Sequence, residues 1–168
     1  MSLSMYQASV PVFIRQLGNL STILGLAATD AETRKIDPSV LLNARLAPDM
    51  FPLSRQVQIA CDGASAGTAL LAGIDAPSYA DDETSFAELQ ARIAQVQAFL
   101  QGIGAAQLDG SEERTVTLSR RGKDTHFQGQ AFLLDHVLPN FYFHVTTAYA
   151  ILRHNGVAIG KRDFLGTR

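Results

Sequence analysis

Cysteine, net charge and long apolar runs are all scarce in this sequence. Cys61 is the single cysteine, which excludes a disulfide within the chain and is typical of a reducing cytoplasm, although a bridge between two subunits stays open. The net charge is −2 and charged residues make up 18% of the chain, so neither a disordered protein nor a nucleic-acid-binding surface is expected. No stretch reaches the roughly 20 apolar residues of a membrane span, and residues 1–5 lack the cationic region of a targeting signal. We therefore expect a cytoplasmic protein that binds neither nucleic acid nor a membrane.

Apolar residues are plentiful by contrast, and they are evenly spread. They make up 46% of the 168 residues, and a chain of this length buries about two-thirds of its unfolded surface without needing a disulfide or a structural metal. The sequence predicts a single domain over residues 1–168.

Apolar positions recur with a helical period in the first half of the chain. One seam predicts a helix over residues 4–28, bent near its start by Pro11, and consists of Val10, Phe13, Leu17, Leu20 and Leu24. Asp37 and Pro38 are typical of a helix start and predict a short helix over residues 38–45. A longer helix is expected over residues 49–71, with small residues on its apolar line that permit close approach of another helix.

The second half carries two further helical segments and one short β segment. Ser85 and Glu88 have the capping-box spacing and begin a helix whose seam runs from Phe86 to Ile103. Alternation over residues 115–118 and 125–127 predicts a hairpin that turns at Arg121-Gly122. A last helical segment follows from Gly129, and Pro139 should either kink it or divide it into residues 130–137 and 140–154. The fold class is therefore all-α, a four-helix bundle with a small β-hairpin before the last helix.

His144 is the residue most typical of a functional site, because it lies on the inward stripe of the last helix among apolar neighbours. Imidazole is a common metal ligand and proton carrier, but Ala148 occupies the position one turn later, where a second ligand would stand. Three interpretations stay open: a buried histidine that is hydrogen-bonded to a neighbouring helix, a metal ligand, and an acid–base or binding group. Gln56 is expected to face His144 if their helices are neighbours, as a hydrogen-bonded pair.

Other polar residues are weaker candidates. Arg55 and Asp62 are expected in surface ion pairs, although an arginine at the mouth of a pocket can also hold a carboxylate. Tyr142 and Tyr149 lie on one face and suit either packing under the hairpin or a subunit interface. Cys61, with no basic neighbour in sequence, is expected to be buried and inert.

The remaining histidines have simple explanations. His136 is expected to be solvated in a turn and His126 exposed on the hairpin, while His154 in the last helical turn complements the helix dipole. No two of the histidines have the spacing of a chelate on one helix.

Two motifs carry a family resemblance. The segments are DMFPLSRQVQ (residues 49–58) and LPNFYFH followed by AYAILRHNGV (residues 138–144 and 148–157). They resemble an uncharacterised bacterial family of unknown function within the DinB and YfiT-like helical-bundle superfamily. The resemblance implies an up-down-down-up four-helix bundle, often a homodimer, whose better-known relatives bind a divalent metal such as zinc or nickel through three histidines.

The resemblance also allows the site to be compared residue by residue. His144 matches the first histidine of the pair on the last helix, whereas Ala148 replaces the second, and Gln56 falls near the position of the third ligand. We therefore expect no metal cofactor and a small-ligand or partner site; its expected residues are His144, Gln56, Tyr149, Arg55 and Asn140. The alternative is a degenerate metal-dependent thiol transferase or hydrolase that uses His144 with His136 or His154. His154 lies about 15 Å further along the helix axis.

Overall fold

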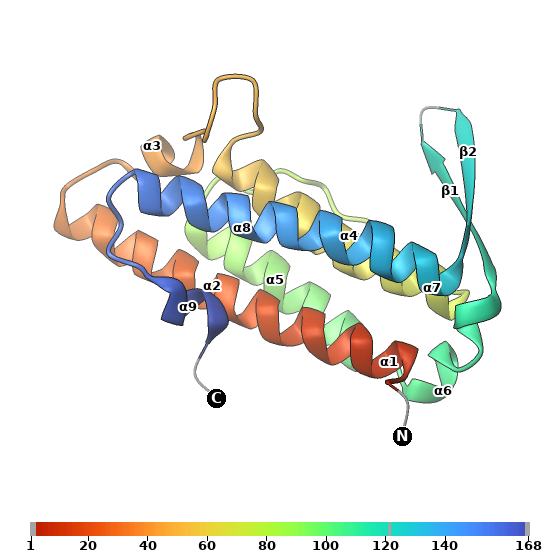
Figure 1. Ribbon diagram of the computed structural model, residues 1–168. Coiled ribbons are helices and arrows are strands. Elements are labelled where there is room, and N and C mark those ends of the chain that lie inside the picture. The colour runs from red at the N-terminus through yellow and green to blue at the C-terminus, as the bar shows by residue number, and fades with distance from the viewer. Residues whose placement is uncertain (1–2, 121, 167–168) are drawn as a thin grey trace.

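The protein is mostly helical and carries one two-stranded antiparallel hairpin (Figure 1). A computed structural model describes residues 3–120 and 122–166. Four long helices lie side by side: α2 (Val10–Thr33), α4 (Leu53–Ala72), α5 (Phe86–Gln101) and α8 (Leu138–His154). The shorter elements are α1 (Met5–Ala8), α3 (Pro38–Leu42), α6 (Ala105–Leu108), η1 (Ser111–Glu113), β1 (Thr115–Arg120), β2 (Lys123–Gln128), α7 (Gly129–Ala131), η2 (Phe132–Val137) and α9 (Lys161–Leu165).

Helices α4 and α8 run in opposite directions and pack closely. Gln56 near the start of α4 contacts His144, which lies well along α8, at 2.7 Å. Near the other end of α4, a Cβ on Gly67 would lie 2.6 Å from Val137 Cγ1, so only glycine permits this approach. The small residues of α4 thus allow close packing, as the sequence indicates.

The long connection between α4 and α5, residues 73–85, runs back along α4. Its Asp81 pairs with Arg55 in the first turn of α4 at 2.5 Å. Because the connection returns to the N-terminal end of α4, α5 begins there and runs in the same direction as α4 (Figure 1). This segment is called the crossover below.

Helix α5 runs antiparallel to α2, and side-chain amides join the two. Gln97 Nε2 donates to the carbonyl of Ile14 at 2.8 Å, and Gln90 Nε2 donates to that of Ser21 at 2.9 Å. The residue numbers rise along α5 as they fall along α2, so the two helices run in opposite directions.

The first predicted helix has a different start and end. Its seam is fully buried, as predicted, with Val10, Phe13, Leu17, Leu20 and Leu24 at 0% exposure. However, the helix is interrupted at Ser9, and Pro11 lies in the first turn of α2. An N–H in the first turn has no partner within the helix, so the proline costs no hydrogen bond there. The helix also continues past residue 28 to Thr33, and Ala31 in this extension is fully buried.

The other helix starts follow the capping chemistry. Asp37 accepts a bond from the Ser39 N–H at 2.8 Å, and Ser85 and Glu88 form the predicted capping box. α3 stops at Leu42, before the predicted 45, and α5 stops at Gln101, before Ile103. The start of α4 corrects the prediction of residue 49, since the helix begins at Leu53 after Pro52. A proline disfavours helical geometry in the residue before it, so residues 49–51 stay outside the helix.

The last helical segment is continuous through Pro139, so of the two predicted outcomes, a kink or a division into two helices, the division is wrong. α7, η2 and α8 follow one another without a break, and η2 is a π-helical turn. Pro139 has no N–H to donate to a carbonyl one turn earlier. The π-helical turn η2, which is wider than an α-helical turn, lies directly before it. His136 therefore sits within a helix and is half-buried, whereas the sequence predicted an exposed turn.

The hairpin is longer than predicted. Strand β1 pairs along its whole length with β2, in a register that sets Val116 opposite Phe127. Gly122 has a φ of 73°, which glycine adopts without strain, whereas Arg121 of the predicted turn lies outside the described residues. Val116 is buried, and Phe127 packs on Phe132 with ring centroids 5.6 Å apart. These contacts attach the hairpin to the helices.

One segment, Met5–Thr33, is long and apolar enough to cross a membrane by length and composition, with a mean hydropathy of 1.2. The sequence did not indicate such a span. A core helix of a soluble protein passes the same test, and the buried seam of α2 is what a bundle helix requires.

Candidate functional site

A hollow of about 390 Å³ lies between α4 and the continuous helix formed by η2 and α8. Its walls are mainly apolar, and a few polar groups point into it. The lining residues are Phe51, Arg55, Ile59, Asp62, Gly63, Ala66, Gly67, Leu70, Leu118, Phe132, His136, Val137, Asn140 and His144. Size and lining are typical of a small-molecule site.

His144 is fixed in this wall by Gln56. Nδ1 of His144 lies 2.7 Å from Oε1 of Gln56, whose amide Nε2 donates to the Phe51 carbonyl at 3.0 Å. Because the amide nitrogen of Gln56 is committed to Phe51, its oxygen must accept from His144. This hydrogen bond therefore requires a proton on Nδ1 of His144. This confirms the predicted Gln56–His144 pair.

Both members of the pair are shielded from water. The exposed fraction is 1% for Gln56 and 8% for His144. A buried pair of this kind is costly to break, because the partner that remains cannot return to water.

The structure brings together most, but not all, of the predicted site residues. Arg55, Asn140 and His144 line the hollow, and Gln56 lies behind His144 as its support. Tyr149 does not line it. Its ring packs edge-on against Phe164 of α9 at 5.8 Å. The expectation that Tyr149 shares a cavity with His144 is therefore wrong.

Tyr142 and Tyr149 have ring partners on α8 and α9. Tyr142 is half-buried against Phe141, with ring centroids 5.5 Å apart.

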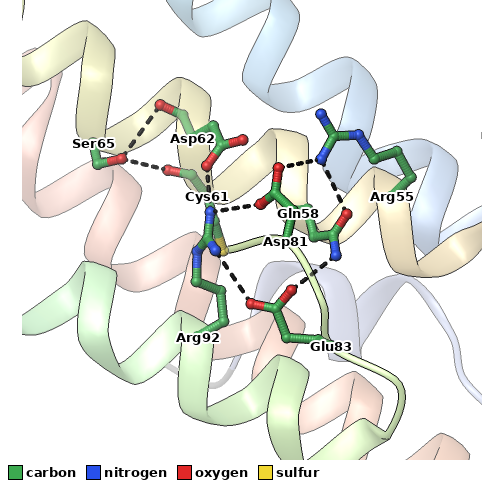
Figure 2. Close-up of polar contacts among 8 residues, drawn as sticks. All are labelled: Arg55, Gln58, Cys61, Asp62, Ser65, Asp81, Glu83 and Arg92. Atoms are coloured by element: carbon green, nitrogen blue, oxygen red, sulfur yellow. Dashed lines mark hydrogen bonds and ion pairs between the residues drawn. The ribbon is translucent and has the colours of Figure 1, made fainter. Parts of the chain in front are cut away.

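A second polar cluster surrounds Arg92 of α5 and shares Asp62 with the hollow (Figure 2). Arg92 is 2% exposed and is paired with Asp62, with Asp81 at 3.3 Å and with Glu83 at 3.2 Å. Its guanidinium also lies 3.6 Å from the centre of the Tyr79 ring. These contacts hold the crossover against α4 and α5.

The Arg92 cluster was not predicted from the sequence. Arg92 sits between Leu89 and Ile93 on the apolar seam of its helix, and the crossover holds an acidic run at residues 81–83. A buried cation needs anionic partners, so an arginine on a seam together with a nearby acidic run was the available signal.

Arg55 links the cluster to the hollow. It pairs with Asp81 and also donates to Gln58 at 3.1 Å, while Gln58 donates to Glu83 at 2.8 Å. The predicted ion pair of Arg55 is thus present, and the same side chain lines the hollow.

Burial shifts the protonation of two groups on α4. The pKa of Asp62 is raised by burial, an effect that Arg92 opposes. Burial likewise raises the pKa of Cys61 to about 12. Cys61 is 0% exposed, so it is the buried, inert thiol predicted and is not available for a bridge between subunits.

Of the remaining histidines, His136 lines the same hollow as His144, whereas His126 and His154 do not line it. His136 stacks on Phe132 with centroids 5.6 Å apart, His126 is exposed and bonded to Thr117 at 3.0 Å, and His154 is exposed in the last turn of α8.

The donor set does not fit the divalent metal of the better-known relatives. Across residues 3–120 and 122–166, no group of three or more His, Cys, Asp or Glu side chains is placed to hold a metal ion. Ala148 is buried without a donor, and both ends of the Gln56 amide are engaged, one of them on His144. Of the three ligands of those relatives, only His144 is present. Ala148 replaces the second, and Gln56, near the position of the third, supports His144 through a hydrogen bond.

The chain matches known proteins over nearly its whole length. A family model described as a domain of unknown function, DUF1993, matches residues 5–165. The crystal structure of a DinB family member protein from Shewanella denitrificans is 46% identical, with a TM-score of 0.91 over 98% of this chain and 93% of that chain. No curated protein matches. The chain belongs to the DUF1993 family, an uncharacterised family of the DinB-like superfamily.

Proposed function

We propose that this protein binds a small molecule, without a metal, in the hollow between α4 and α8. The observation that carries the proposal is the chain of contacts from Phe51 through Gln56 to His144, on the wall of a mainly apolar hollow. A hydrogen-bonded support fixes the orientation of an imidazole, and a fixed polar group in an apolar pocket gives a ligand its orientation.

The arrangement of helices supports this proposal. We infer that the four long helices form the up-down-down-up bundle of the superfamily, in one domain. The antiparallel pairs α2–α5 and α4–α8, and the shared direction of α4 and α5, support that topology. In such a bundle, sites form between facing helices.

We also propose a cytoplasmic homodimer. Phe143 on α8 is 55% exposed and its ring lies 5.2 Å from that of His144, so an apolar surface borders the hollow. Light scattering of a Phe143→Glu variant tests this: a dimeric wild type and a monomeric variant support it, and a monomeric wild type contradicts it.

A fragment screen by thermal shift tests the proposed site. A ligand that binds only the folded state raises the melting temperature. Ala66→Trp fills the hollow from α4 and should abolish the shift, whereas Ala94→Trp on the exposed side of α5 should preserve it. Hits that survive Ala66→Trp would refute the site.

Metal analysis of the purified protein is the complementary test. We expect zinc and nickel to be removed by dialysis, because the donors for a tight site are missing. Retention of one equivalent of either metal would contradict the proposal and favour a metal-dependent enzyme.

A further inference from the structure

The charged groups of the hollow are unevenly placed along its length. One end, at the start of α4, is lined by Phe51, Arg55 and His144, and the other end, beside the hairpin, by Leu70 and Leu118. At about 1.5 Å per residue, Leu70 lies about 22 Å from Arg55 along α4. The hollow is therefore elongated, with Arg55 at one end and a mainly apolar wall at the other, where His136 stacks on Phe132.

Arg55 is the cation of this lining, and its carboxylate counterpart is already neutralised. Asp62, the other charged residue of the lining, pairs with the buried Arg92. Arg55 is itself paired with Asp81, so the geometry of its remaining guanidinium nitrogens, and not an uncompensated charge, decides which ligand it can hold.

The guanidinium of Arg55 is hydrogen-bonded through only one of its three nitrogens within the described part of the chain. Its bonds to Asp81 and Gln58 both use Nη1, at 2.5 and 3.1 Å. Figure 2 shows the other terminal nitrogen pointing away from both partners. Within the described part of the chain, Nη2 and Nε make no hydrogen bond. These two nitrogens form one edge of the guanidinium plane, which is the edge that binds a carboxylate through two parallel bonds.

From this geometry we propose that the ligand is an elongated monocarboxylate with an apolar body, a proposal that rests on the function proposed above. The carboxylate binds the Nε–Nη2 edge of Arg55. The apolar body extends along α4 past Ile59 and Ala66 to the wall formed by Leu70, Leu118 and Phe132. Asp81 and Gln58 keep the arginine in place before the ligand arrives, which lowers the entropy lost on binding.

Three probes with the same ten-carbon chain separate the charge from the apolar body: decanoate, decanol and decylamine. Calorimetric titration of the wild type should rank decanoate first. Arg55→Gln should weaken decanoate roughly tenfold to a hundredfold, the loss expected for a bond to a charged group, and leave decanol unchanged. Arg153→Gln, which removes an exposed arginine at the end of α8, is the matched control and should affect neither.

The outcomes distinguish this inference from the proposed function. Decylamine binding as tightly as decanoate, or decanoate binding equally to wild type and Arg55→Gln, overturns the carboxylate assignment. If decanol still binds and Ala66→Trp abolishes its binding, the hollow remains the site. If none of the three probes binds, the inference fails, and the fragment screen decides separately whether the hollow takes another ligand.

Discussion

Replacing Gln56 with leucine should destabilise the protein strongly, although leucine is apolar and of similar size. The change removes the acceptor of the buried His144 Nδ1–H and the donor to the Phe51 carbonyl. An unpaired buried donor costs about 1–3 kcal/mol, and loss of the bond to the more exposed Phe51 loop costs about 0.5–1.5 kcal/mol. We expect a total of about 2–4 kcal/mol. For a chain of this length, that lowers the melting temperature by about 4–16 °C.

Urea unfolding followed by circular dichroism measures this loss, with an unchanged slope as the sign that only stability has changed. The decisive comparison is the double variant Gln56→Leu/His144→Leu, in which no imidazole is left without its acceptor. It should be about 1–2 kcal/mol more stable than the sum of the single changes predicts. A single Gln56→Leu cost below about 0.5 kcal/mol, or additive single changes, would refute the role assigned to this pair.

Three further predictions concern groups away from His144. Arg92→Met should cost about 3 kcal/mol in urea unfolding, at the low end of the range for a broken buried ion pair, because Asp62 and Asp81 are partly exposed; a loss no greater than that of Arg55→Met would contradict it. Hydrogen bonds from Thr84 and Ser85 lower the pKa of Glu88, so its stabilisation is complete above about pH 4.5 and is lost as the pH falls through the folded-state pKa. The unfolding free energy of wild type should therefore fall more steeply with acid than that of Glu88→Gln, and parallel curves would disprove this. With a pKa near 12, Cys61 should react with Ellman's reagent at pH 8 only when guanidinium chloride unfolds the protein; rapid labelling of the native protein would show that the thiol is accessible.

Local chemistry made much of the secondary structure predictable. The seam on α2, the aspartate cap before Pro38 and the capping box of Ser85 and Glu88 depend only on residues within a few turns of one another. Errors arose where several local signals compete. Pro139 was expected either to kink the last helix or to divide it, and a π-helical turn before the proline keeps the helix undivided.

The sequence also determined which groups the site has and which it lacks. Ala148 in place of a donor, and an amide at position 56, argued against a metal, and the pairing of Gln56 with His144 followed once their helices were neighbours. Only the tertiary structure decided the rest. It packed Tyr149 against Phe164 and paired Arg92 with carboxylates of the crossover. It also bonded Arg55 through Nη1 to Asp81, beside the hollow. The physical reason is that helical period fixes the face on which a side chain lies, whereas the rotation and spacing of packed helices fix what that face meets.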